Sequence, residues 1–245
     1  MAINKEGNGY TFGFAFALVV VVGTILASLS MGLKEKQQQN GVVKKKIDIL
    51  KAMLPEDEAK AVNRSNADEI FDQYVDLNNA LVLDNKGTPR EGMEAFEVDI
   101  KKEYKDKNLK ETDKNYPLFI AEKDGKKLYI IPIVGKGLWG PIWGNICLNE
   151  DQRTILGASF GHKGETPGLG AEITQKFFVD RWIGETISTD EGMFAKFEVV
   201  KDGSGNGPNS KVDGITGGTI TSKGVEEMVN RCLAVYAAYF NSLND

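Results

Sequence analysis

The segment DGITGGTITS, residues 213–222, combines three glycines, four hydroxyl side chains and one carboxylate directly before a helical pattern. Backbone N–H groups in the first turn of a helix lack intrahelical acceptors, and with the helix dipole they stabilise a phosphate. Gly217 and Gly218 carry no side chain that would keep a ligand from the backbone. The segment therefore indicates a phosphate site, and it places Thr219 two or three residues before the helix.

The same residues also have a purely structural interpretation. Asp-Gly and Gly-Gly are turn dipeptides, and Thr221 or Ser222 is the natural N-cap of the following helix. Glycine-rich loops before helices are common, so spacing alone favours this second interpretation.

A second segment with few bulky side chains, GETPGLGAEI, occupies residues 164–173. Its proline and glycines predict a tight turn, which leaves Leu169 free to face a flat ligand. Glu165 and Thr166 offer polar contacts at the edge of such a ligand. The alternative is a plain connection between a strand and a helix that begins near Ala171.

Both segments carry a resemblance to known proteins. DGITGGT resembles the flavinylation sequon Asp-x-x-Ser/Thr-Gly-Ala-Ser/Thr, in which the phosphate of FMN is attached to the last hydroxyl residue. Gly218 departs from it, because the family has alanine there. ETPGLG resembles a motif of the same FMN-binding domains, which occur in the C subunit of the sodium-translocating NADH:quinone oxidoreductase and in the G subunit of the Rnf complex. The resemblance covers essentially the whole chain.

The resemblance implies a role for each motif residue. Thr219 would carry FMN, the implied cofactor, through a phosphoester bond, and no residue would be catalytic or bind a metal. The phosphate pocket would be formed by Thr216, Gly217 and Gly218, and the isoalloxazine would be surrounded by Glu165, Thr166 and Leu169.

A third segment, GKGLWGPIWG at residues 135–144, resembles a Gly-Leu-Trp stretch of the C subunits and favours the sodium pump over the Rnf complex. A tryptophan can stack on a flavin, and we take Trp139 as the candidate. Trp139 and Trp143 could equally be core residues, so both interpretations stay open.

The implied function is that of a membrane-anchored flavoprotein subunit that relays electrons between redox centres of partner subunits. It would have no NADH site of its own, and the chain has no dinucleotide fingerprint after a predicted strand. The implied partners are the other subunits of the membrane complex and, during maturation, a flavin transferase. The alternatives are the Rnf G subunit and an anchored, non-redox binding or sensor domain.

Residues 7–33 contain no charged side chain and are long enough for a helix that spans a bilayer. A signal peptide is the alternative, because Ser28 and Ser30 resemble a small-x-small cleavage site, but the apolar run exceeds the usual signal length. Lysines follow the span, yet long domains cross membranes largely regardless of charge, so composition leaves the orientation open. The resemblance implies a single pass through the bacterial inner membrane with the FMN domain on the periplasmic side.

Four regions are expected: a cytoplasmic N-terminus at 1–9, a transmembrane helix at 10–33, a helical stalk at 34–79 and an FMN-binding domain at 80–245. Within the stalk the spacing predicts a helix over 47–54, a break at Pro55, and a second helical stretch that runs toward Leu81. Its apolar side would carry Val62, Ile70, Tyr74 and Leu77.

The remaining pattern predicts an α+β domain, an antiparallel sheet with flanking helices. Strands are expected at 80–84, in a hairpin over 117–134 that turns at Asp124-Gly125, in a second hairpin over 141–160, and at 194–202. A helix at about 171–182 would bury Ile173, Phe177, Phe178 and Trp182, and the last helix would run over about 222–240. Residues 201–210 form a glycine-rich loop without evident chemistry.

The net charge of −5 makes nucleic acid an unsuitable partner. Cys147 and Cys232 form no CxxC pair, which excludes a self-contained zinc site and favours two buried thiols over a disulfide. His162 lies near Ser159 in sequence, but no nucleophile-elbow pattern accompanies them, and we interpret His162 as a surface residue.

Overall fold

The computed structural model describes residues 7–205 and 207–243, and the chain divides into two compact units, Met1–Lys45 and Lys46–Asp245. The first unit contains most of helix α1 (Asn8–Met53). An 18-residue window of α1 has a mean hydropathy of 2.5, and none of it is buried. The helix therefore has the length and composition that a membrane span requires.

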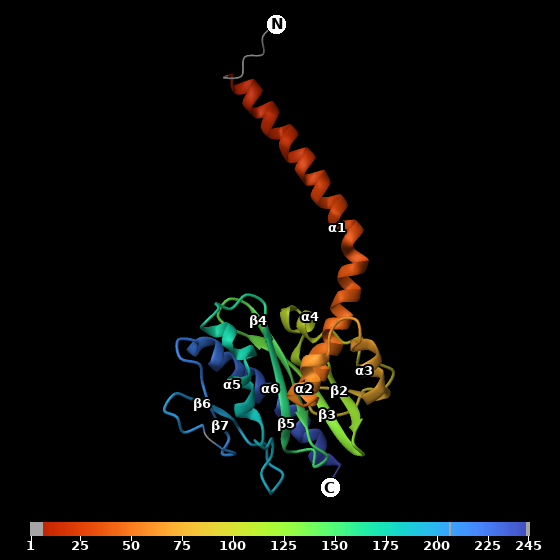
Figure 1. Cartoon of the computed structure of the whole chain (residues 1–245), viewed down its shortest axis with the longest axis vertical. Coiled ribbons are helices and arrows are strands. Elements are labelled where there is room, and N and C mark those ends of the chain that lie inside the picture. Colours follow the sequence, from red (N-terminus) through yellow and green to blue (C-terminus); the bar gives the residue numbers. More distant parts are fainter. Residues whose placement is uncertain (1–6, 206, 244–245) are drawn as a thin grey trace. The chain divides into compact units, whose positions relative to one another are not determined.

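The second unit is built on a five-stranded antiparallel sheet in which consecutive strands are neighbours (Figure 1). Its strands are β1 (Val75–Leu83), β2 (Tyr116–Lys123), β3 (Lys126–Lys136), β4 (Pro141–Leu148) and β5 (Ile155–His162). Asp124 and Gly125 connect β2 to β3 with φ values of 53° and 73°, as a two-residue hairpin turn requires. This turn and the antiparallel pairing confirm the predicted α+β sheet.

Helix α6 (Thr219–Ser242) covers one face of the sheet. Alternate residues of β3, among them Ile131 and Ile133, are fully buried in the core that α6 completes. The Tyr236 hydroxyl donates to the Pro117 carbonyl at 2.8 Å and ties the helix to β2. The helix passes so close to β3 that a Cβ at Gly135 would lie 2.6 Å from Met228 Cβ.

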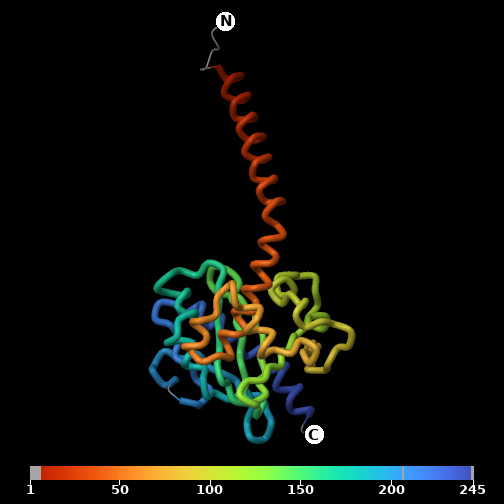
Figure 2. Tube along the Cα trace, turned by 45° about the vertical axis from the view of Figure 1, so that its right-hand side comes forward, coloured from red at the N-terminus to blue at the C-terminus, as the bar shows by residue number. Residues whose placement is uncertain are grey.

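The opposite face of the sheet is covered by residues 46–53 of α1, by α2 (Glu56–Ala61) and by α3 (Ala67–Tyr74) (Figures 1 and 2). The Ser159 hydroxyl on β5 donates to the Asp48 carbonyl at 2.8 Å. Phe96 packs edge-on against Phe71 and Phe119, with ring centroids 5.7 and 6.2 Å apart. Between β1 and β2 lie the short helices α4 (Ile100–Lys105) and η1 (Glu111–Asp113).

The second helical stretch predicted to run toward Leu81 is wrong in two places: residues 62–66 divide it into α2 and α3, and it ends at Tyr74. Strand β1 begins at Val75, so Leu77 lies on an edge strand and its side chain is exposed. Residues 75–83 pair with β2 through a register shift between Asp76 and Leu81. Backbone hydrogen bonds to β2 stabilise the strand, and the helical pattern of apolar residues is too short here to favour a helix over that pairing.

The single helix predicted over 171–182 is instead three short pieces: η2 (Gly170–Thr174), α5 (Lys176–Val179) and η3 (Asp180–Trp182). Ile173, Phe178 and Trp182 are buried as predicted, but Phe177 is 50% exposed. The extended conformation of Gln175, with φ −84° and ψ 147°, interrupts the helical period and turns Phe177 outward.

The strand predicted over 194–202 is reduced to β6 (Glu198–Val200), which pairs in parallel with β7 (Lys211–Asp213). The pattern of antiparallel hairpins gave no indication of this parallel pair. The pair brings Val200 opposite Asp213, where the first motif begins.

Cys147 and Cys232 are buried free thiols, on β4 and α6 respectively. Burial raises the pKa of the Cys147 thiol to about 12, and it also raises the pKa of Cys232. Both therefore pack as small apolar residues, as the sequence predicts.

Candidate functional site

The first motif forms the tight connection from β7 into α6. Gly217 has a φ of +76°, and Gly218 is the N-cap of the helix. Thr219 is the first residue of α6, so the predicted helix start near residue 222 and the predicted place of Thr219 ahead of the helix are both wrong.

Thr221 and Ser222, predicted as alternative N-caps, lie inside the first turn, and their hydroxyls bond to residues outside the helix. The Thr221 hydroxyl donates to Glu165 Oε2 at 2.6 Å, and Ser222 Oγ accepts the Ile215 N–H at 3.0 Å. Within residues 207–243 no side chain caps the start of α6. The N–H groups at the start of this 24-residue helix therefore remain available to an anion.

A cavity of about 440 Å³ lies at this helix start. Thr216 and Thr219 line it, together with two cationic side chains, Arg181 and Lys201, and one carboxylate, Asp213. Arg181 Nη1 donates to the carbonyls of Asp213 at 2.6 Å and Gly214 at 3.2 Å, so it also fixes the beginning of the motif. The Asp213 carboxylate offsets one of the two positive charges, and the remaining positive charge suits a phosphate together with the helix N–H groups and the two hydroxyls.

The sequence interpretation missed both cations. Arg181 lies in η3, and Lys201 belongs to the glycine-rich loop to which the sequence assigns no chemistry. The parallel pairing of β6 with β7 places Val200 opposite Asp213, so the next residue, Lys201, lies beside the first motif. No local signal marks either residue, because their proximity depends on contacts between distant segments.

The second motif lies against the first. A Cβ at Gly217 would lie 2.6 Å from Leu169 Cδ2, and a Cβ at Gly218 would lie 3.2 Å from the Leu169 carbonyl carbon. Gly168 turns the chain at a φ of +75°, and its N–H is accepted by Glu172 Oε1 at 2.8 Å. The structure thus brings the two motifs together, as their joint resemblance predicts.

The polar residues of the second motif occupy different environments. Thr166 and Leu169 are exposed, whereas Glu165 is only 4% exposed. Glu165 Oε1 accepts the Trp139 N–H at 2.9 Å, and Oε2 accepts the Thr221 hydroxyl. Glu165 therefore joins three segments beneath the site, while Thr166 offers the exposed polar contact.

The two tryptophans of the third segment also differ in solvent exposure. Trp139 is 68% exposed, and its backbone is bound to Glu165. Trp143 is half-buried, and Lys101 Nζ lies 3.6 Å from the centroid of its ring. Of the two, Trp139 is the residue that lies next to the motifs.

His162 and Ser159 do not form a catalytic pair. His162 is half-buried, and its Nδ1 accepts the Glu165 N–H at 3.1 Å, whereas the Ser159 hydroxyl is bound to the Asp48 carbonyl. His162 thus supports the turn into the second motif rather than acting as a freely exposed residue.

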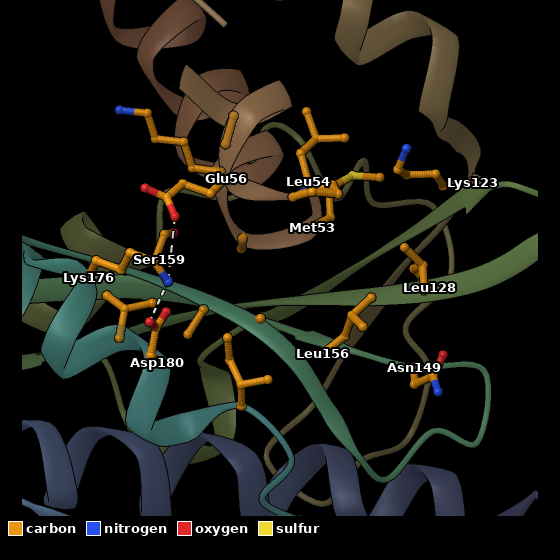
Figure 3. Close-up of a pocket in the computed structure, with 18 of the residues that line it drawn as sticks. Met53, Leu54, Glu56, Lys123, Leu128, Asn149, Leu156, Ser159, Lys176 and Asp180 are labelled. Carbon is orange, nitrogen blue, oxygen red and sulfur yellow. Dashed lines mark hydrogen bonds and ion pairs between the residues drawn. The ribbon is translucent and has the colours of Figure 1, made fainter. Parts of the chain in front are cut away.

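A larger cavity, of about 680 Å³, lies elsewhere (Figure 3). It is formed by the end of α1, α2, β5 and α5, and it contains no residue that the motifs predict. Lys176 joins its walls through ion pairs with Glu56, at 3.6 Å, and with Asp180. We place the candidate site at the smaller cavity, because that is where the hydroxyls, cations and helix start converge.

This fold and site define an FMN-binding domain: the family model of that description matches residues 137–234, which include both motifs. The C subunit of the Na(+)-translocating NADH-quinone reductase of Vibrio parahaemolyticus is 30% identical over 240 residues, 92% of this chain and 90% of the relative. The corresponding C subunit of Pseudomonas aeruginosa is 29% identical, over 93% and 92% of the two chains. The chain belongs to the family of C subunits of the Na(+)-translocating NADH-quinone reductase, which confirms the resemblance.

Solved structures agree with this family. The crystal structure of the C subunit of the same reductase from Parabacteroides distasonis is 38% identical, has a TM-score of 0.72, and covers 84% of this chain and 96% of its own. NqrC of Shewanella oneidensis, at 24% identity, has a TM-score of 0.65 over 82% of this chain and 96% of its own, and it supports the fold.

Proposed function

We propose that this chain is a membrane-anchored flavoprotein subunit of a Na⁺-translocating NADH:quinone oxidoreductase, and that it relays electrons through FMN joined to Thr219 by a phosphoester bond. The observation that carries the proposal is the position of Thr219 at an uncapped helix start, in a cavity that Arg181 and Lys201 also line. A hydroxyl that is to hold a phosphate needs positive partners around it, and this one has them.

The attachment is a phosphoryl transfer in which the Thr219 oxygen is the nucleophile. A flavin transferase would supply a flavin-bearing phosphoanhydride. The Thr219 oxygen would form a bond to the flavin-bearing phosphorus as the anhydride bond breaks, with the hydroxyl proton released and the second phosphate as the leaving group. No oxidant or reductant is consumed in this step.

The chain's own residues would bind and position the cofactor. Arg181 and Lys201 offset the phosphate charge together with the N–H groups of α6, while Thr216, Gly217 and Gly218 shape the pocket. Leu169 and Trp139 present apolar surface for the ring, and Thr166 a polar edge. When bound, FMN supplies the electron-transfer chemistry, and the protein supplies position and electrostatics.

The proposed location is the bacterial inner membrane, with α1 as a single-pass anchor and the FMN domain on the periplasmic side. The other subunits of the complex would be the redox partners, and NADH would bind to one of them. We retain the four regions 1–9, 10–33, 34–79 and 80–245 as a proposal for how the chain is used, although β1 starts within the third.

The test is to express the full chain with a flavin transferase, denature it, and measure flavin fluorescence and intact mass. We expect a mass increase of one FMN less one water, which Thr219→Ala abolishes while the domain still folds. Thr219→Ser is the matched control, because it keeps the hydroxyl and should be labelled. Label that persists in Thr219→Ala would refute the site, and a colourless parent chain would favour a non-redox binding domain.

A further inference from the structure

We infer that Glu165 is a positioning residue for flavin attachment, a role that rests on the proposed function of Thr219. The carboxyl group of Glu165 joins the first turn of α6 to the segment that carries Trp139. In this arrangement each carboxyl oxygen of Glu165 accepts a hydrogen bond from the protein itself. It sets the place of the attacking hydroxyl and of the exposed indole relative to each other.

The contact with α6 is made two residues after the attachment point. Thr221 is 2% exposed, and its hydroxyl lies 2.6 Å from Glu165 Oε2. Residues within one helical turn move together, so a bond that fixes Thr221 also fixes the orientation of Thr219. Since the hydroxyls of Thr221 and Ser222 bond to Glu165 and Ile215, neither competes with a phosphate for the helix N–H groups.

The contact with the third segment is made by the other oxygen. Glu165 Oε1 accepts the Trp139 N–H at 2.9 Å, within a turn that the bond from Gly137 N to the Gly140 carbonyl closes at 2.8 Å. The turn leaves the Trp139 side chain outside, where it is largely exposed. A single carboxyl group thereby connects the attachment point with the candidate ring contact.

The space around this carboxyl group is closed by two glycines. A Cβ at Gly137 would lie 2.6 Å from Glu165 Oε1, and a Cβ at Gly170 would lie 2.7 Å from Oε2. A larger residue at either position would displace the carboxyl group from its two donors. The slot therefore accepts a glutamate side chain in one orientation, which is the property a positioning residue needs.

Glu172 provides a matched comparison within the same motif. It stabilises the turn through Gly168 N, at 2.8 Å, but no bond to α6 or to the Trp139 segment is observed for it in residues 7–205 and 207–243. Its loss should affect the turn alone. Variants of Glu165 and Glu172 therefore distinguish a role in stabilising the loop from a role in positioning the attachment site.

The experiment compares full chains carrying Glu165→Ala, Glu165→Gln, Thr221→Val and Glu172→Ala. For each we would measure the initial rate of flavin attachment by the transferase, the visible circular dichroism of the attached flavin, and the melting temperature. We expect Glu165→Ala to slow attachment by about tenfold or more, since misplacement of a reacting group has effects of this size. Its attached flavin should also have altered dichroism.

Glu165→Gln should rescue both readouts, because the amide oxygen still accepts from Trp139 N and the amide N–H can donate to Thr221 Oγ1. Thr221→Val should slow attachment in the same direction, and Glu172→Ala should leave the rate near that of the parent. If Glu165→Ala fails to fold, Thr221→Val decides the question, because it removes one hydrogen bond without changing side-chain volume appreciably.

The outcomes separate this inference from the proposed function. A parent chain that acquires no flavin overturns the proposed function, and this inference with it. A labelled parent with equal rates and dichroism in Glu165→Ala, or in Thr221→Val if that variant decides, overturns this inference alone. A slowing in Glu172→Ala as large as in Glu165→Ala would also overturn it, because loop support would then explain both.

Discussion

The Leu169 side chain fills the space in which a Cβ atom of Gly217 would lie, with Cδ2 2.6 Å from that position. Gly217 also has a φ of +76°, a conformation that L-residues rarely adopt. This contact joins the second motif to the first, because Leu169 belongs to one and Gly217 to the other. The two motifs are therefore packed against each other at this point.

We predict that Gly217→Ala destabilises the domain by about 1–3 kcal/mol, from backbone strain and overpacking together. Flavin attachment should slow as well, because the chain turns into Thr219 at this point. Urea unfolding and attachment kinetics would measure both effects. The double variant Gly217→Ala, Leu169→Ala should recover the overpacking part but not the strain, and strictly additive effects of the two substitutions would contradict the contact.

The second prediction concerns the cations of the phosphate cavity. Lys201→Ala should reduce the rate of attachment severalfold, because it removes one positive charge near the incoming phosphate. Arg181→Ala should have a larger effect, since it also releases the carbonyls of Asp213 and Gly214. The measurement is the attachment rate at several salt concentrations.

Lys196→Ala is the matched control for Lys201→Ala, because Lys196 is exposed on the approach to β6 but does not line the cavity. Its rate should equal that of the parent chain at every salt concentration. Equal rates for the Lys196 and Lys201 variants would show that Lys201 does not assist phosphate binding.

The third prediction follows from the buried thiols. Cys147 has an ordinary pKa of 9.0 when the chain is unfolded, and burial raises it to about 12 in the fold. Well below pH 9 the thiol is protonated in both states and makes no contribution to the pH dependence of stability. Between pH 9 and 12 only the unfolded chain releases the proton, so stability falls as pH rises, by at most about 1.4 kcal/mol per pH unit for this group.

Denaturant unfolding at pH 8, 9 and 10 would measure this slope, and Cys147→Ala should reduce it. An unchanged slope in that variant would contradict the assignment. At neutral pH the native domain should also resist thiol reagents, whereas the unfolded chain should expose both Cys147 and Cys232.

The fourth prediction tests the proposed orientation. Because the two native cysteines are buried, a new exposed cysteine reports its own side of the membrane. In spheroplasts, a membrane-impermeant maleimide should label Lys107→Cys, which lies between α4 and η1, but not Asn8→Cys at the start of α1. The reverse pattern would place the flavin domain in the cytoplasm.

Local features of the sequence predict much of this fold. The Asp124-Gly125 turn is specified by two residues that tolerate positive φ, and the apolar stripe of α6 is long enough to determine a helix. The resemblance adds Thr219, which composition and spacing cannot distinguish from an ordinary loop residue. These parts depend on neighbours in sequence or on a motif, so they could be predicted from the sequence.

The remaining parts depend on contacts between distant segments. The start of α6 was misplaced because Thr221 and Ser222 bond to Glu165 and Ile215 instead of capping the helix. Arg181 and Lys201 reach the cavity through the packing of η3 and the parallel β6–β7 pair. The sequence shows that a hydroxyl lies near a helix start, but it does not show which hydrogen-bond partner that hydroxyl has in the folded chain.

The place of Thr219 in α6 would limit how a cofactor attached to it can move. A threonine side chain offers one rotatable bond between the backbone and its oxygen, and here that backbone is the first turn of a helix packed against the sheet. For FMN attached there, the freedom of the isoalloxazine ring would come from its own ribityl phosphate chain, because the threonine adds none of the reach of a long lysine side chain. Movement of the ring beyond the length of that chain would require a displacement of the whole domain.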